Sequence, residues 1–479
     1  MSLLQMRIFS IKRRSDSLPT EIDQWLRYAE DGKQFEKNFS QLEALDTFMC
    51  QILERLQSNV AELMRLIEAI PLDTEKLLEQ IQIVEEGIAK AQYIWNYFRT
   101  KLDQRFVPQV AQMLLAADLI SYDCYTSVRN KANSLGIEHK LGLRDYPLSY
   151  LLVNSSPVAR RRTSPMTWSR AQKIAALDYD MLPLPIIGIP WDQIGNAWEL
   201  LSLHHEVSHN LDADLNKPSK ELGSKIVRRL LEKGSSQART SNWESWIGEI
   251  IADLLGILLA GPPFVSFLAS FMTLPKSVVC SFNANDPHPT PYLRILLNSE
   301  FVRAISANGT MSQYIDVLLH KWKKVYSEPS QELVAYTKDF DIVIDTLLSA
   351  NLEALVNKEG KTHTLHDLFI FNEEDFQHQL TARDHFLSGK EIAWNLPLRH
   401  IVGAAYMASE ERIEHKTSFD QDFAVKLAEQ VKSSIFMRAP AGQLALRTKQ
   451  SKQYLQDLAN AYFDSSFNTN GDGDNQTIW

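Results

Sequence analysis

The residues His205-Glu206-Val207-Ser208-His209 combine two imidazoles and a carboxylate at a spacing that can do chemistry. On an α-helix, His205 and His209 lie four residues apart on one face, so both rings can bind one metal ion. Glu206 can then reach a water on that metal and act as general base. A zinc ion lowers the pKa of such a water from about 15.7 to about 7 and polarises a carbonyl group, while the glutamate passes the proton to the leaving amine. The spacing therefore predicts zinc-dependent hydrolysis of an amide.

The register of this motif is unambiguous. The i+4 partner of His204 is Ser208, so His204 cannot replace His205, and we expect it to be a surface or packing histidine. Asp192 or Asn196 is expected to cap the helix. At this histidine content, H-E-x-x-H arises by accident in roughly one or two chains per hundred. The motif alone therefore does not define a site, and a third ligand is needed.

A third ligand is predicted in the segment "SNWESWIGEIIADLLGILLAGP". Glu249 and Asp253 are four residues apart on a helix that is otherwise apolar, and burying two acids there is costly unless they are paired or bind a metal. Glu249 as third zinc ligand, with Asp253 bonded to the free nitrogen of a ligating histidine, satisfies both acids. One alternative is that Glu249 and Asp253 bind no metal and face a loop or Arg228-Arg229. Another is that Glu244 is the third ligand in place of Glu249.

These motifs together carry a family resemblance. H-E-x-x-H followed by E-x-x-x-D is similar to the gluzincin pattern, and "GEIIADLLG" resembles the E-x-x-A-D-x-x-G segment of zinc peptidases of the HtpX and CAAX-prenyl-protease type. "NDPHPTPYLRI" is similar to that family's H-P-x-x-x-x-R segment. The resemblance implies that His288 and Arg294 lie near the active site and contact the substrate or the developing oxyanion. The alternative is that His288 caps a loop and Arg294 forms a surface salt bridge. Tyr292 is another candidate donor to the oxyanion.

The resemblance covers Leu184 to Ile295 and departs from the membrane-bound members, because their spanning helices are missing. The long interval between the two metal-binding helices predicts an inserted helix around "SKELGSKIVRRLLEKG". In zincins generally, an edge strand beside the metal-binding helix pairs with the substrate backbone. By resemblance, Leu184–Ile189 is that strand, and Gly188 would let a peptide approach closely.

The elements that must position these residues are mostly helical. Apolar residues recur at steps of three and four from Leu42 to Phe98, with a break at Pro71 and a plausible N-cap at Asp73, which predicts an antiparallel helical hairpin. "YPLSYLLV" and "LPLPIIGIP" are short apolar runs bracketed by proline and predict strands. The apolar stretch Leu254–Met272 predicts a buried helix, a turn at Pro262-Pro263 and a second helix.

The predicted fold class is therefore mainly α with a small β-sheet: an α+β zincin-like core flanked by helical bundles. The predicted segments are an N-terminal helical bundle (1–145), a metallopeptidase core (146–310), a C-terminal helical domain (311–464) and a disordered tail (465–479).

Composition restricts the class of partner. The 479 residues carry a net charge of −9, which argues against nucleic acid as the main partner. The one dense basic run, Arg160-Arg161-Arg162, is expected to be a solvated loop. The three cysteines are far apart and form no C-x-x-C pair, and the first residues do not resemble a secretory signal. These features predict a cytoplasmic protein with no membrane span.

The sequence thus predicts a zinc endopeptidase in which His205, His209 and Glu249 bind Zn²⁺ and Glu206 is the general base. The helical flanks could restrict the cleft or recruit a protein partner, which predicts a selective or regulated protease. The alternatives are a non-catalytic helical adaptor that retains a zincin core, which would have no need of Glu206, and a metallohydrolase acting on something other than a peptide.

Overall fold

The structure is a computed structural model in which the described residues are 3–32, 35–69, 74–142, 145–152, 183–283, 286, 288–306, 309–368, 371–392, 395–414, 420–447 and 450–464. Four of the sequence predictions fall outside these residues: the break at Pro71, the N-cap at Asp73, the loop at Arg160–Arg162 and the disordered tail 465–479.

The described chain divides into two compact units. The first lies within Met1–Asp103, Arg160–Leu184 and Arg447–Trp479, and the second lies within Gln104–Ala159 and Pro185–Leu446. All of the predicted site residues belong to the second unit. The boundaries drawn from the sequence at residues 145 and 310 do not coincide with this division and stay predictions.

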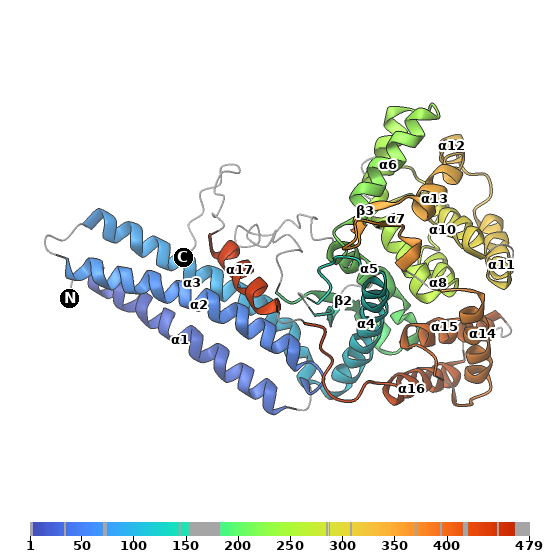
Figure 1. The fold of residues 1–479 in the computed structure, drawn as a ribbon. Coiled ribbons are helices and arrows are strands. Elements are labelled where there is room, and N and C mark those ends of the chain that lie inside the picture. The colour runs from blue at the N-terminus through green and yellow to red at the C-terminus, as the bar shows by residue number, and fades with distance from the viewer. Residues whose placement is uncertain are drawn as a thin grey trace. The chain divides into compact units, whose positions relative to one another are not determined.

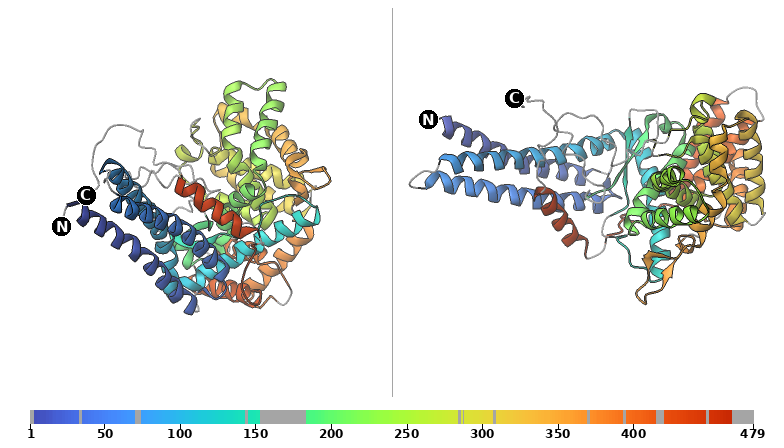
Figure 2. Two further views of the ribbon diagram at one scale, coloured as in Figure 1. Left: turned by 60° about the vertical axis from the view of Figure 1, so that its left-hand side comes forward. Right: turned by 90° about the horizontal axis from the view of Figure 1, so that it is seen from above.

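The first unit is a bundle of long helices, α1 (Leu3–Asp31), α2 (Phe39–Glu68) and α3 (Thr74–Leu102), which run side by side (Figures 1 and 2). Helices α2 and α3 pack together as the predicted hairpin. The last helix, α17 (Ser451–Asp464), packs against α2. It therefore belongs to this unit, although it was predicted at the end of the C-terminal segment. An apolar helix stripe predicts burial but does not name the partner helix.

The second unit is built mainly from helices around one core. Its metal-motif helix is α5 (Leu203–Asp214), followed by α6 (Pro218–Glu232), which is the predicted inserted helix, and by α7 (Gln237–Ala260). The remaining helices are α4 (Pro108–Ser134), α8 (Pro263–Phe271), α9 (Lys276–Val279), α10 (Pro291–Ser306), α11 (Thr310–Val325), α12 (Gln331–Thr337), α13 (Phe340–Ser349), α14 (Glu373–Leu387), α15 (Leu398–Glu414) and α16 (Gln421–Met437).

Two small sheets complete the described part of this unit. The predicted strands form β1 (Leu148–Leu152) and β2 (Ile186–Pro190), which pair in parallel. A second pair, β3 (Leu352–Val356) and β4 (Thr362–His363), is antiparallel and was not predicted. These strands have five and two residues, too few for a clear period-two pattern. The prediction of a mainly α fold with a small β-sheet is confirmed.

The apolar stretch after the predicted metal ligands is divided between two buried helices, as predicted. Helix α7 ends at Ala260 and α8 begins at Pro263. Gly261 makes the turn at φ +80°, where a Cβ atom would also collide with the ring of Phe371. Among the described residues, no helix has both the length and the apolarity that crossing a membrane requires.

A buried ion pair joins β1 to the helices. The Arg105 and Asp118 side chains are 2.7 Å apart between Nη1 and Oδ2, and both are almost completely buried. Asp118 accepts the backbone N–H of Ser149 on β1, and Arg105 donates to the carbonyl oxygen of Ser149. Burial raises the pKa of Asp118, and the Arg105 charge acts against that shift. The pair therefore fixes the strand that pairs with β2, and β2 in turn packs against α5.

We expect Asp118→Ala to destabilise the second unit by about 3–5 kcal/mol, because it leaves the Arg105 charge buried without its partner. Urea denaturation followed by circular dichroism measures this change. The matched control is Glu429→Ala, which removes an exposed carboxylate paired with Lys432 and should change stability by less than about 0.5 kcal/mol. Equal midpoints for the two variants would contradict the assigned role of the ion pair.

Candidate metal centre

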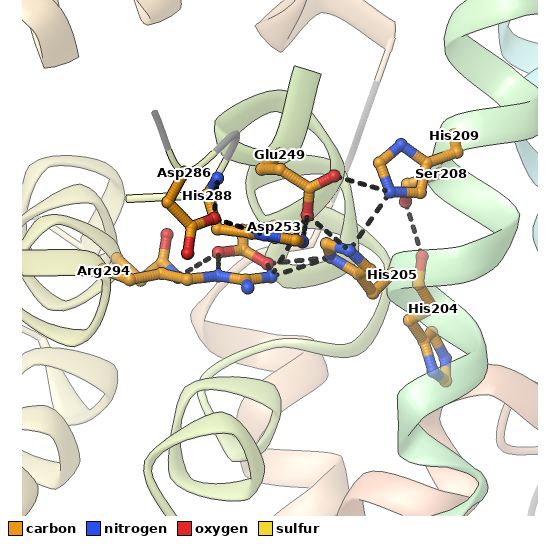
Figure 3. Close-up of polar contacts among 10 residues, drawn as sticks. His204, His205, Ser208, His209, Glu249, Asp253, Asp286, His288 and Arg294 are labelled. Atoms are coloured by element: carbon orange, nitrogen blue, oxygen red, sulfur yellow. Dashed lines mark hydrogen bonds and ion pairs between the residues drawn. The ribbon is translucent and has the colours of Figure 1, made fainter. Parts of the chain in front are cut away.

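Helix α5 presents the two histidines of the motif on one face. The Nε2 atoms of His205 and His209 are 3.2 Å apart, and both side chains are partly exposed, at 12% and 23% (Figure 3). The capping prediction is wrong in detail. Ser202 occupies the N-cap position without a side-chain hydrogen bond, because a 3-10 helix (Ala197–Ser202) leads directly into α5. Carbonyl groups of this 3-10 helix accept a hydrogen bond from the backbone N–H of Leu203, the first residue of α5, so this N–H does not need a side-chain cap.

Helix α7 packs against α5 and brings in the predicted third ligand. The Glu249 side chain is only 3% exposed. Its Oε2 lies 3.2 Å from Nε2 of His205, and its Oε1 lies 3.5 Å from Nε2 of His209. These three residues form a group whose ligand atoms all lie within 4.8 Å of one another. The structure thus brings together the three predicted metal ligands.

The spacing of these atoms fits a tetrahedral metal ion. Zinc bonds to nitrogen and oxygen of about 2.0–2.1 Å place two tetrahedral ligand atoms about 3.3 Å apart. The separation of 3.2 Å between the two Nε2 atoms agrees with that value, and each histidine has a different oxygen of Glu249 near it, at 3.2 Å from His205 and 3.5 Å from His209. Two imidazoles and one carboxylate are also a donor set that zinc accepts. The group can therefore hold a metal ion with little movement of its side chains.

Asp253 fixes the orientation of the first histidine. Its Oδ1 lies 2.8 Å from Nδ1 of His205. A carboxylate can only accept a hydrogen bond, so Nδ1 carries the proton and Nε2 is directed at the metal position. Burial lowers the pKa of His205, but the bonds to Asp253 and Glu249 outweigh it and raise that pKa to about 10. Metal binding must therefore displace a proton from Nε2.

Arg294 compensates the buried charge of Asp253. Its Nε and Nη2 donate to the two oxygens of Asp253 at 2.5 and 2.6 Å, and Nη2 is 3.9 Å from Oε2 of Glu249. Burial would raise the pKa of Asp253, but the Arg294 charge and hydrogen bonds hold it well below its usual range. Arg294 is therefore close to the centre, as expected, and is an ion-pair partner of Asp253. Direct contact with a substrate stays a prediction.

His288 also lies close to Glu249. Its Nε2 is 3.5 Å from Oε2 of Glu249, and the side chain is 45% exposed. Its Nδ1 lies 3.0 Å from Oδ1 of Asp286, and its backbone N–H donates to the same oxygen (Figure 3). The indole N–H of Trp246 holds the carbonyl oxygen of Asp286 at 2.9 Å. His288 is thus oriented toward the metal ligands by its own loop and by α7.

Three other residues considered from the sequence lie outside the described ligand group, and the role of Tyr292 as an oxyanion donor stays a prediction. Glu244 is exposed on α7 and does not belong to the group of ligands. Tyr292 is buried on α10, and burial raises the pKa of its hydroxyl. His204 is a packing histidine. Its ring nitrogens lie 3.1 Å from the carbonyl oxygens of Leu201 and Arg399, and burial lowers its pKa to about 4.

The strand beside the metal helix differs from the expectation at Gly188. A Cβ atom there would lie 2.5 Å from Cγ of Leu152, so the space above the glycine is filled by a side chain of the neighbouring strand. Gly188 thus allows β1 and β2 to pack closely. A larger residue at this position would disturb the sheet itself, so it is a poor probe of peptide binding.

Sequence reasoning missed Asn298, Asp286 and Trp246, all of which bond to residues of the centre or of its loop. Asn298 lies four residues after Arg294, and Trp246 lies three residues before Glu249, so each shares a helix face with a predicted site residue. That spacing is the signal that could have found them. Asp286 gives a weaker signal, since an acid two residues before a histidine is common.

Comparisons with protein-family models, with curated proteins and with solved structures gave no match for this chain. The resemblance to peptidases of the HtpX type stays a prediction.

Loss of a residue that only hydrogen-bonds to a metal ligand lowers metal affinity by about 10–100-fold. We expect Glu249→Ala, which removes a ligand itself, to lower metal affinity by more than this. Glu244→Ala is the matched control, because it removes an exposed carboxylate from the same helix. Metal content of the purified variants and competition with a chromophoric zinc chelator measure the change. Retention of stoichiometric zinc by Glu249→Ala would mean that another acid completes the site.

Proposed function

We propose that this protein is a zinc-dependent endopeptidase. The observation that carries the proposal is the convergence of His205, His209 and Glu249, with Glu206 on the same helix as both histidines. The spacing of the ligand atoms, and not the motif alone, favours a metal ion. The identity of that ion as zinc follows from the preference of zinc for histidine and carboxylate donors in a small tetrahedral group.

The arrangement favours a catalytic centre over a structural one. Structural zinc sites have four protein ligands, whereas catalytic sites have three and leave one position open. Among the described residues, the group contains three ligands, and His209 and His288 are partly exposed beside it. A substrate carbonyl could therefore approach from the side on which these histidines reach solvent.

Each residue has a defined part in peptide hydrolysis. The bound zinc would supply Lewis acidity toward water and toward the substrate carbonyl. Glu206 takes a proton from the attacking water and returns it to the amine as the C–N bond breaks. His288, whose Nδ1–H bonds to Asp286, would donate from Nε2 toward the oxygen of the tetrahedral intermediate as the imidazolium, in which both ring nitrogens carry a proton. Asp253 keeps the Nε2 atom of His205 directed at the ion.

We expect Glu206→Gln to lower kcat for peptide cleavage by about 10²–10⁴-fold while zinc remains bound, because the amide keeps the shape but cannot take a proton. His205→Ala should lose zinc and activity together. The measurements are metal analysis and cleavage of a peptide library, with Glu244→Gln as a control that alters an exposed carboxylate outside the group.

The outcomes separate the competing functions. A wild-type protein without stoichiometric zinc or another divalent ion would overturn the proposal. If zinc binds but no peptide is cleaved, the helical adaptor with a retained zincin core or a metallohydrolase acting on something other than a peptide is favoured. If cleavage is unchanged in Glu206→Gln, another residue is the base.

A further inference from the structure

We propose that Asn298 is a positioning residue of the metal centre, which acts on the zinc ligand His205 through Asp253. This inference rests on the proposed metal site but not on its use for peptide hydrolysis. The side chain of Asn298 is buried, at 3% exposed, on α10. Its Nδ2 donates to Oδ2 of Asp253 at 2.8 Å.

The two oxygens of Asp253 have different partners. Oδ1 accepts from Nδ1 of His205 and from Nη2 of Arg294, whereas Oδ2 accepts from Nε of Arg294 and from Asn298. Among the described donors to this carboxylate, His205, Arg294 and Asn298, the amide of Asn298 is the one that neither carries nor can gain a charge. The four bonds occupy the carboxylate's acceptor positions, so its plane is fixed on both sides.

This fixation matters because an aspartate does not set the direction of its own oxygens. Rotation about the terminal bond of the side chain is broad and nearly two-fold. A tilt of the Asp253 carboxylate would move Oδ1 away from Nδ1 of His205 and let the imidazole turn. The direction of Nε2 toward the ion would then be lost, together with part of the metal affinity.

Helix geometry explains why Asn298 can act together with Arg294. The two residues are four apart on α10, so their side chains leave the same helix face and reach one carboxylate on α7. Arg294 neutralises the charge of Asp253. Asn298 adds a hydrogen bond without adding charge, so that Asp253 can still polarise the ring of His205.

The test is the zinc affinity of Asn298→Leu, which removes the amide N–H and keeps a side chain of similar volume. We expect the Kd for zinc, measured by competition with a chromophoric chelator, to rise about 10-fold. The visible spectrum of the Co²⁺-substituted protein should also change, because the histidine ligand is no longer held in one orientation. Neither readout depends on peptide cleavage.

Ser299→Ala is the matched control. Ser299 is the next residue on α10, is also buried, and bonds within its own helix to the carbonyl oxygen of Ile295. Its loss should leave zinc affinity within about twofold of the wild type. A purely structural role for Asn298 would lower the unfolding temperature of the metal-free protein and leave both metal readouts unchanged.

Asn298→Ser serves as a second variant if the leucine variant does not fold, because serine is small and polar but too short to reach Asp253. Wild-type zinc affinity and an unchanged Co²⁺ spectrum in a folded variant at this position would overturn the inference while the metal site stands. Failure of the wild type to bind either ion would instead overturn the proposed function, and the inference with it.

Discussion

The candidate centre depends on one buried negative charge, that of Asp253. Its carboxylate is 1% exposed and accepts from His205 on α5 and from Arg294 and Asn298 on α10, while Asp253 itself belongs to α7. An unpaired carboxylate at this depth would cost several kcal/mol. Three helices are therefore held in register by the requirement to satisfy one side chain. The ligand geometry is a consequence of that requirement, since two of the three metal ligands are on α5 and the third is on α7.

Charge balance gives the centre its chemical character. Asp253 and Arg294 cancel each other, so the ligand group itself contains one negative charge, on Glu249, and two imidazoles. With a divalent ion bound, the ligand group alone would carry a net positive charge, while the buried carboxylate of Glu206 lies on the same helix as both histidines. Electrostatic interactions in such a buried setting are stronger than in water. Such a centre stabilises an oxygen that gains negative charge during a reaction. His288, held by Asp286, lies 3.5 Å from Glu249 at the exposed side of the centre.

The sequence predicted those parts of the fold and site that local spacing determines. His205 and His209 must share a helix face, as must Glu249 and Asp253, so their grouping required only that α5 and α7 pack together. Strands β1 and β2 and the inserted helix α6 also follow from local patterns. The partners of Asp253 on α10 could not be derived in the same way. Tertiary packing decides which face of α10 lies against the carboxylate of Asp253. It also decides that α17 packs against α2.

Among the described residues, the three ligands and the donors to Asp253 all lie between His205 and Asn298. Helices α11 to α16 nevertheless belong to the same compact unit as these donors. Domains generally fold as units. The donors are therefore expected to reach their final spacing only when the whole unit folds, so a substitution in the later helices that unfolds the unit would also remove the ligand group.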